Sequence, residues 1–190
     1  MILEQFIKYN TLLVALLLSF FSILSLFQPG LPPTHDGEYH VIRFFEFDNT
    51  LKSGNIFPVW AQHLNFGYGV PLFNYVYPLP NYAASVFHFF GFSFIDAFKL
   101  NLILATFVGS ITAYLLGLQK FGKWGGLLTS AFYTYAPYHF LDIYVRGSVG
   151  EVWALAFFPL PLIFINRILV KVKITDILLL GVSLSLIILK

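Results

Sequence analysis

Long apolar runs separated by shorter polar segments dominate the chain, and they predict membrane-spanning helices. The first run, residues 6–27, has the roughly 20 residues needed to cross a hydrocarbon core. Further spans are expected at residues 98–118, 124–138, 149–170 and 177–190. The last run is still apolar at the end of the sequence, which favours the N-terminal part of a longer protein. The pattern therefore predicts an all-α, polytopic transmembrane protein whose 190 residues form a single module.

A cleavable signal peptide is the alternative interpretation of the first run. The apolar core of a signal peptide is about 7–15 residues long and is followed by a small-residue cleavage site. Residues 6–27 exceed that length, and no such site follows them. An uncleaved first span is therefore favoured.

A long polar and aromatic segment, residues 28–97, separates the first span from the second. Its Pro and Gly residues favour irregular backbone, which cannot lie against lipid tails because unpaired amides there cost several kcal/mol each. Residues 79–92 form a short apolar run of about 14 residues, which favours a helix lying in the membrane interface over one that crosses it. We therefore predict one large outer loop with interfacial helices.

Composition supports a membrane protein. Hydrophobic residues make up 58% of the chain and charged residues 11%, compared with about 45–50% and about 25% in soluble domains. The chain has no cysteine, which excludes a disulfide framework, a thiol nucleophile and a Cys-ligated metal. The formal net charge of +2 does not indicate nucleic acid as a partner, and a lipid bilayer is the expected surrounding.

Basic residues near the ends of the predicted spans indicate the orientation. A cytoplasmic N-terminus places a group of them on the inner side, as the positive-inside rule expects. This group is Lys8, Lys120, Lys123, Arg167, Lys171 and Lys173. Of the acidic residues, Glu4 and Asp176 are then inside, and all five histidines are outside. We therefore predict a multi-pass protein of the cell membrane with its titratable side chains gathered at the outer face.

Two features of the predicted spans concern helix packing. A stripe of small residues with four-residue spacing runs along the second span and predicts the close approach of another helix. The stripe consists of Ala105, Gly109, Ala113 and Gly117. In the fourth span, Pro159 and Pro161 predict a kink or a break, because proline cannot donate the backbone hydrogen bond of a helix interior.

The first candidate site follows the first predicted span. If residues 36–52 form one helix, a rotation of 100° per residue places Asp36, His40 and Arg43 on one stripe and Glu38 nearly opposite. Asp36 could act there as a general base, a role worth about 10²–10⁴ in rate. It could instead be a purely structural N-cap of the helix.

The same segment leaves a metal cofactor open. Carboxylate oxygens and imidazole nitrogens are suitable ligands for a divalent ion, although their spacing here matches no recognised motif. The available donors are His35, Asp36, Glu38 and His40.

The second candidate site lies between the third and fourth predicted spans. Asp142 and Arg146 are four residues apart, which favours a local ion pair worth at most about 1 kcal/mol if it is exposed. Arg146 could instead bind a phosphate group, because the guanidinium fork matches phosphate oxygens. Glu151 could simply favour the dipole of the fourth span. Both candidate sites are expected on the outer side, which makes a shared aqueous pocket the working hypothesis.

Several motifs give the chain a resemblance to a known family. They are SGNIFPVW (53–60), GYGVPLFNY (67–75), PLP (78–80), APYH (136–139) and YVRG (144–147). Through them the chain resembles the bacterial integral membrane proteins described as 6-pyruvoyl-tetrahydropterin synthase-related, over residues of about 34–162. Nothing in the chain resembles the soluble pterin enzyme.

That family in turn resembles the GT-C class of glycosyltransferases, which take sugars from polyprenyl-phosphate carriers. The resemblance implies a GT-C-like fold whose large outer loop carries a modified DxD motif, and Asp36, Gly37 and Glu38 stand in that position as a DxE version. If both carboxylates act together, Gly37 must break the helix. By resemblance, Asp36 is the base and Arg146 steadies the leaving phosphate, at the outer face of a bacterial plasma membrane.

Together the two candidate sites supply the residues expected to carry the function. The candidate catalytic residues are Asp36, Glu38 and His40. The candidate substrate-binding residues are Arg43, Trp60, Tyr68, His139, Asp142, Arg146 and Glu151. The aromatic residues of the loop could line a sugar site or form an ordinary interfacial belt.

Sugar transfer from a polyprenyl-phosphate carrier is thus the first functional hypothesis. A non-catalytic protein of envelope or polysaccharide assembly that keeps the GT-C scaffold is the second, and a transporter is the third.

Overall fold

The computed structural model of the chain describes the backbone of residues 2–189 and the side chains of residues 10–189. Its helices are α1 (Ile2–Ser22), α2 (Gly37–Lys52), α3 (Leu79–Phe89), α4 (Phe94–Thr134), α5 (Pro137–Phe140), α6 (Val149–Phe157), α7 (Pro159–Val170) and α8 (Ile174–Ile188). Three 3-10 helices, Leu24–Phe27, Asn65–Gly67 and Leu72–Asn74, and a π-helix, Leu141–Arg146, complete the elements. The prediction of an all-α chain is confirmed for this range. The side chains of Glu4 and Lys8, used above to infer orientation, lie outside the described residues.

Helix α4 turns back on itself at Gly122. This residue has φ 71° and ψ −170°, a conformation that glycine adopts without the steric cost of a side chain. The two limbs then pack against each other, and the hydroxyl oxygens of Ser110 and Ser130 lie 2.7 Å apart across them. A Cβ on Gly126 would lie only 3.0 Å from the Tyr114 ring, so the limbs approach closely. The element is therefore a helical hairpin with a long first limb.

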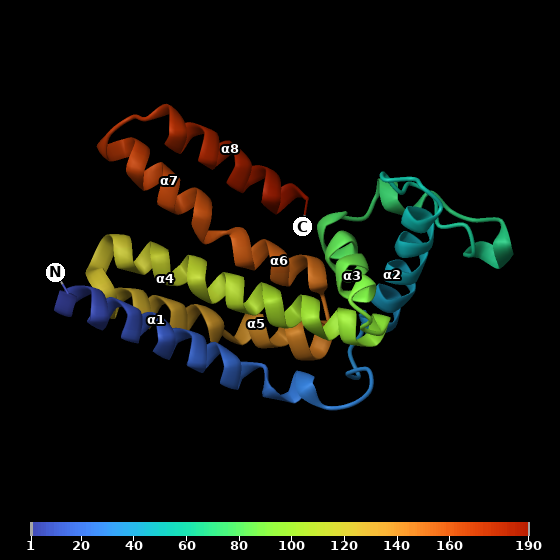
Figure 1. Cartoon of the computed structure of the whole chain (residues 1–190), viewed down its shortest axis with the longest axis horizontal. Helices are drawn as coiled ribbons and strands as arrows, with labels where there is room; N and C mark the ends of the chain where they lie inside the picture. The colour runs from blue at the N-terminus through green and yellow to red at the C-terminus, as the bar shows by residue number, and fades with distance from the viewer. Residues whose placement is uncertain (1, 190) are drawn as a thin grey trace.

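Helices α1, α4 and α6 lie side by side in the long part of the molecule (Figure 1). The Tyr135 hydroxyl donates to the Leu18 carbonyl at 2.9 Å and joins α4 to α1. Gly109 faces α6 so closely that a Cβ there would lie 3.4 Å from the Cα of Ala156. Close helix approach along the small-residue stripe is thus confirmed at Gly109.

The fourth apolar run bends where the prolines predict it. Helix α6 ends at Phe157 and α7 begins at Pro159, with Phe158 between them in a helical conformation. The chain then reverses after Val170, and α8 packs back against α7. The result is a kinked helix, residues 149–170, followed by a hairpin.

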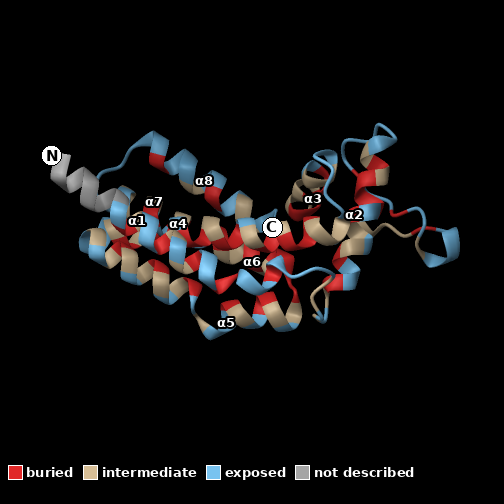
Figure 2. Cartoon of the chain, turned by 60° about the horizontal axis from the view of Figure 1, so that its bottom comes forward, coloured by how far each residue is buried: buried red, intermediate tan, exposed pale blue. Residues whose placement is uncertain are grey.

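Helices α2 and α3 pack across one end of this bundle (Figure 1). Their connection is held by Glu46, which is 1% exposed and accepts the backbone N–H of His63 at 3.1 Å. The Nδ1 atom of the His63 imidazole lies 2.9 Å from the other Glu46 carboxylate oxygen. Helix α3 confirms the short helix predicted at residues 79–92. The buried residues line the contacts of α4 with α6 and α2 (Figure 2) and include Phe44, Phe98, Leu102, Val149 and Val152.

The predicted polytopic, GT-C-like arrangement of five spans is wrong. Within the described residues, two helices are long and apolar enough to cross a membrane, α4 and the kinked helix 149–170. Two shorter apolar helical segments are residues 10–22, which are the part of the 21-residue helix α1 whose side chains are described, and residues 174–188. Apolar run length overestimated the number of spans because the runs 98–118 and 124–138 belong to one folded-back element.

Candidate functional site

The two candidate segments identified from the sequence meet in the structure. The backbone N–H of His35 donates to the Val145 carbonyl at 3.0 Å, and that of Asp36 donates to the Arg146 carbonyl at 2.8 Å. These hydrogen bonds connect the residues that precede α2 to the end of the π-helix. The start of α2 and the turn before α6 therefore form one continuous surface.

Glycine at two positions allows this close approach. Gly147 has φ 67°, in the left-handed region, and a Cβ there would overlap the Thr34 hydroxyl. A Cβ on Gly37 would lie 2.6 Å from the same oxygen. The Thr34 hydroxyl is buried between the two glycines and has no hydrogen-bond partner among the described residues. Larger residues at either glycine would force the two segments apart.

Asp36 is the N-cap residue of α2, but its carboxylate makes no capping hydrogen bond. The helix begins at Gly37. Asp36 is half-buried, and the carboxylate is not used to hold the helix end. The purely structural N-cap interpretation is thus not supported, and the side chain is available to a ligand.

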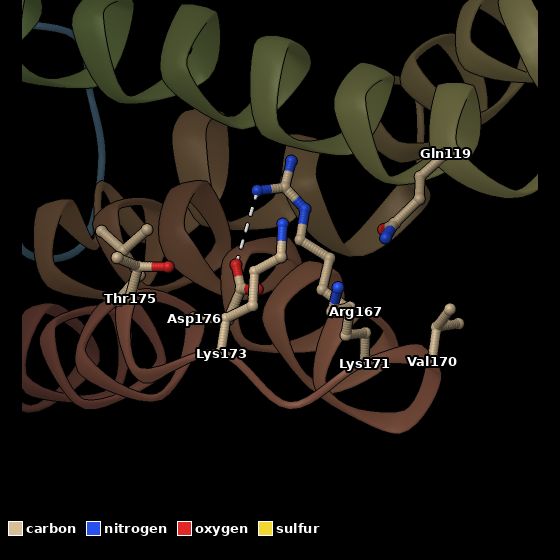
Figure 3. Close-up of a pocket in the computed structure, with 8 residues that line it drawn as sticks. Gln119, Arg167, Val170, Lys171, Lys173, Thr175 and Asp176 are labelled. Atoms are coloured by element: carbon tan, nitrogen blue, oxygen red, sulfur yellow. Dashed lines mark ion pairs between the residues drawn. The ribbon is translucent and has the colours of Figure 1, made fainter.

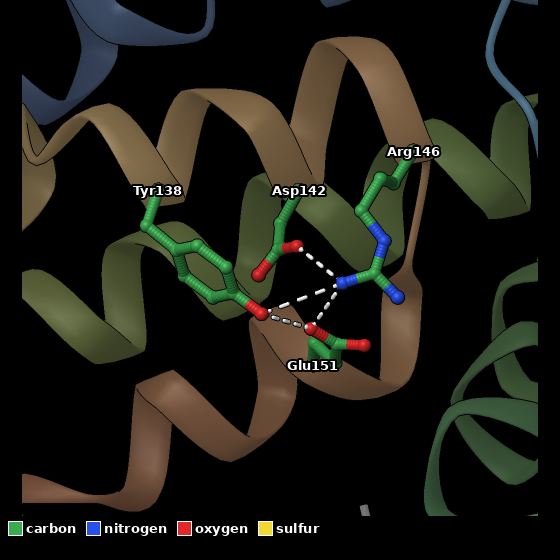
Figure 4. A network of polar contacts seen from close by, with 4 residues as sticks. All are labelled: Tyr138, Asp142, Arg146 and Glu151. Atoms are coloured by element: carbon green, nitrogen blue, oxygen red, sulfur yellow. Dashed lines mark hydrogen bonds and ion pairs between the residues drawn. The ribbon is translucent and has the colours of Figure 1, made fainter.

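Arg146 is the centre of a polar network with Tyr138, Asp142 and Glu151 (Figure 4). Its Nη1 atom lies 3.1 Å from Asp142 Oδ1 and 2.5 Å from Glu151 Oε2. The Tyr138 hydroxyl donates to the same Glu151 oxygen at 2.6 Å. The local Asp142–Arg146 ion pair expected from the sequence is confirmed. We call these four residues the Arg146 network.

The network combines a buried carboxyl with a partly open face. Asp142 is 0% exposed, and its Oδ2 atom has no hydrogen-bond partner among the described residues. Burial, and secondly the nearby charge of Glu151, raise the pKa of Asp142 to about 6. Hydrogen bonding to Glu151 raises the pKa of Arg146, which keeps the guanidinium charged. One arginine therefore balances two carboxyl groups, and the network is anionic above a pH of about 6.

Tyr77 lies between the two candidate segments. Its ring packs on Gly150 so closely that a Cβ on that glycine would overlap it. The Gly150 backbone N–H hydrogen-bonds to the phenol oxygen, and the charges of Arg43, Asp36 and Glu151 all act on this group. Burial is the largest effect and raises the pKa of Tyr77, so the phenol is neutral and can donate a proton in a hydrogen bond.

Arg43 is the cation that faces this space from α2. It is half-buried, and it has no hydrogen bond or ion pair with any described residue. Its charge acts on both Tyr77 and His40. Among the two arginines of the site, Arg43 is therefore the one free to bind an added anion.

The two histidines proposed from the sequence are buried. His40 is 1% exposed and stacks on Phe98 with ring centroids 5.9 Å apart. Burial, and secondly Arg43, lower the pKa of His40 to about 3. His139 is 3% exposed, lies 3.3 Å from the Thr106 hydroxyl, and has its pKa lowered by burial to about 4. Both imidazoles are neutral at physiological pH and are packed within the protein.

Three other proposed residues are not brought into this site. Glu38 is exposed in the first turn of α2 and makes no ion pair with a described residue. The Trp60 carbonyl accepts a hydrogen bond from Thr50, near the C-terminal end of α2, and Tyr68 is 82% exposed farther along the same loop. Since α2 has 16 residues, its two ends are about 24 Å apart. Trp60 and Tyr68 therefore do not line the space around Asp36.

The donors considered for a divalent ion do not form a metal site. Within the described residues, no group of three His, Asp or Glu side chains converges as metal ligands. His40 turns its ring into an aromatic cluster, while Glu38 is exposed. We assign no metal role to these residues.

Sequence reasoning considered Tyr77 only as one of the loop aromatics and gave no specific role to Tyr138 and Gly150. A signal existed for Tyr138, because residues 138, 142 and 146 are spaced four apart and can share one side of a helix. Tyr77 and Gly150 meet only through the packing of the segment before α3 against the start of α6. No local pattern marks such a contact.

Comparison with known proteins adds a sequence relative but no function. No family model and no solved structure matches the chain. A protein of Lactococcus lactis subsp. cremoris (strain MG1363), described as an uncharacterized protein, is 28% identical over 168 residues. The match covers 82% of this chain and 26% of that protein, so the chain spans about a quarter of the relative's length.

Proposed function

We propose that this chain carries the carrier-phosphate site of a membrane glycosyltransferase that takes a sugar from a polyprenyl-phosphate carrier. The observation that supports the proposal most is the backbone pairing of Asp36 with Arg146, which brings a carboxylate without a capping hydrogen bond next to the Arg146 network. The motif resemblance to the 6-pyruvoyl-tetrahydropterin synthase-related membrane proteins supports it independently. The site consists of Asp36, Arg43, Tyr77, Arg146 and Glu151.

In this proposal Asp36 is the general base. Its carboxylate takes the proton of an acceptor hydroxyl, while the acceptor oxygen forms a bond to the anomeric carbon of the sugar. The bond from that carbon to the phosphate oxygen breaks, and the carrier phosphate leaves with the electron pair. The transfer inverts the anomeric configuration, because the base and the leaving group lie on opposite sides of the sugar.

Arg43 is the principal phosphate ligand of the proposed site. A guanidinium without a partner offers a planar fork of donors to two phosphate oxygens. Arg146 is already paired with Asp142 and Glu151, so its attraction for a bound phosphate is weaker than that of an unpaired arginine. The Tyr77 phenol, held neutral by burial, can donate a further hydrogen bond.

The proposed site faces the outer side of a bacterial plasma membrane. Within the described part of the chain, α4 and the kinked helix 149–170 are long and apolar enough to cross it. The polar cluster lies at one end of these helices, and Lys120, Lys171 and Lys173 lie at the other. The positive-inside rule then places the N-terminus and the lysines in the cytoplasm.

Sugar transfer by purified full-length protein tests the proposal. Polyprenyl-phosphate sugars would be supplied to the wild type, to Asp36→Asn and to Asp96→Asn, a matched change of a carboxylate outside the site. Asp36→Asn is expected to lose about 10²–10⁴ in turnover while Asp96→Asn keeps it. Equal turnover in Asp36→Asn and the wild type would remove Asp36 as the base.

A non-catalytic role in envelope or polysaccharide assembly is the second candidate. The observation that favours it is the saturation of Arg146, whose Nη1 atom is within 3.1 Å of two carboxylates. Such a network can serve solely to fix the turn before α6. Failure of the wild type to transfer any polyprenyl-phosphate sugar, with the fold intact, would favour this role.

A further inference from the structure

A second charged cavity lies at the end of the bundle opposite the proposed site, where α7 and α8 diverge from α4. It has a volume of about 530 Å³. Arg167, Lys173 and Gln119 point into this space from α7, the α7–α8 turn and α4 (Figure 3). Lys171, Thr175 and Asp176 complete its polar lining. Nothing in the proposed transfer reaction uses these residues.

The cavity carries an excess of positive charge. Arg167, Lys171 and Lys173 face one carboxylate, Asp176, which is 6% exposed and lies 3.8 Å from the Arg167 guanidinium. The ion pair neutralises one of the three cations, which leaves both lysines to attract an added anion. The cavity is therefore complementary to a phosphate group.

An apolar groove continues from this cavity into the bundle. It has a volume of about 460 Å³ and shares Gln119, Arg167 and Leu179 with the charged cavity. The remaining lining is apolar, from Leu115, Leu118, Leu160, Ile163 and Phe164. A charged mouth joined to an apolar groove matches a ligand with an anionic head and a hydrocarbon tail.

The turn beside the cavity has the character of a membrane-interface segment. Residues 170–174 alternate apolar and basic side chains, and Val170 and Val172 are 89% and 70% exposed. Exposed valines would be unfavourable in water, whereas lysine heads beside apolar side chains suit the headgroup layer of a bilayer. This surrounding favours a lipid over a soluble phosphate as the source of the anion.

We propose that the cavity between α4, α7 and α8 binds an anionic phospholipid, with its phosphate between Lys171 and Lys173 and one acyl chain in the apolar groove. The lysines supply the attraction, since cations near a membrane surface attract anionic lipid headgroups. Arg167 donates from the wall, and its aliphatic stem covers the start of the groove. The site is independent of the proposed sugar transfer.

Native mass spectrometry of the detergent-purified full-length chain tests this proposal. Phosphatidylglycerol is expected to remain bound at concentrations at which phosphatidylcholine dissociates. The double variant Lys171→Gln/Lys173→Gln should weaken phosphatidylglycerol binding on the order of tenfold. The matched variant Lys120→Gln/Lys123→Gln removes the same charge from residues that do not line the cavity, and should change binding less than twofold.

Two further arms separate lipid from free phosphate. Leu115→Trp narrows the apolar groove and is expected to weaken phosphatidylglycerol binding severalfold. Inorganic phosphate, measured by calorimetry, should bind at least a hundredfold more weakly than the lipid. Equal losses in the two lysine pairs, or equal retention of phosphatidylcholine, would overturn the proposal. Tight phosphate binding together with no effect of Leu115→Trp would replace the lipid by a soluble anion and also overturn it. An unchanged melting temperature in each variant confirms that the fold is intact.

Discussion

The ring of Tyr77 packs directly on the Cα of Gly150, where a Cβ would overlap its atoms. This contact joins the segment before α3 to the first turn of α6, and it places the phenol between the charges of Arg43 and Glu151. The proposed site therefore depends on the absence of a side chain at one helical position.

Gly150→Ala should destabilise the chain because the added methyl group must displace the Tyr77 ring. A cost of about 1–3 kcal/mol in the free energy of unfolding is expected, as for other overpacked sites. Gly181→Ala is the matched control, since a Cβ there meets no atom within 4 Å. That variant should be neutral or slightly stabilising. Thermal unfolding in detergent measures both, and equal shifts would contradict the packing argument.

Arg146→Gln should destabilise the chain by about 3 kcal/mol, because it leaves the buried Asp142 carboxylate without its cation. Adding Asp142→Asn removes the uncompensated charge and should recover most of the loss. Unfolding of the two single variants and the double variant, measured at a pH above 7, gives the coupling energy. Additive effects would show that the two side chains do not depend on each other.

Stability should rise with pH between about 4 and about 6. In this window the folded chain keeps His40 and His139 neutral and Asp142 protonated, whereas the unfolded chain has both imidazoles charged and the carboxyl ionised. Unfolding then takes up two protons and releases one, which gives a slope of about 1.4 kcal/mol per pH unit.

His40→Phe isolates the contribution of one imidazole to that slope. Phenylalanine can occupy the stack on Phe98 and does not titrate. The remaining His139 and Asp142 then act in opposite directions, so the free energy of unfolding should be nearly independent of pH. Denaturant titrations at several pH values across the window measure the slope. A slope unchanged from the wild type would mean that His40 is protonated in the folded chain.

Labelling of single introduced cysteines tests the proposed orientation in the membrane. The chain has no cysteine of its own that could react with the label. Phe66, in the 3-10 helix Asn65–Gly67, is 100% exposed, and Phe121, beside the turn of α4, is 74% exposed. The loop before α3 and the turn of α4 lie at opposite ends of the molecule (Figure 1). Phe66→Cys should react with a membrane-impermeant maleimide in intact cells, and Phe121→Cys should react only after the cells are opened. The reverse pattern would place the proposed site in the cytoplasm.

The sequence predicted elements better than it predicted how they combine. Periodicity and prolines located the bend at Phe158 and the short helix before Phe90, because these depend on local backbone chemistry. The number of spans was wrong because apolar run length does not report where a helix stops or folds back. The reversal at Gly122 is set by the packing of the two limbs, which no single run reveals.

In the candidate site, too, local contacts were predicted from the sequence and tertiary contacts were not. The ion pair of Asp142 and Arg146 followed from their spacing, and the structure contains it. The helical wheel placed His40 beside Asp36, but it could not show that the imidazole faces Phe98 within the core. A wheel gives the direction of a side chain from its own helix, whereas burial is decided by the neighbouring elements. For the same reason, only tertiary packing shows that Tyr77 belongs to the site.

The hydrogen bond from Asp36 to Arg146 also has a consequence for biosynthesis. The ribosome synthesises Asp36 early and Arg146 about a hundred residues later. The two segments therefore cannot form this hydrogen bond until most of the bundle has been made. During that interval the Thr34 hydroxyl is not yet enclosed by Gly147. Premature termination before Val145 would leave a product in which the backbone N–H groups of His35 and Asp36 lack their carbonyl partners.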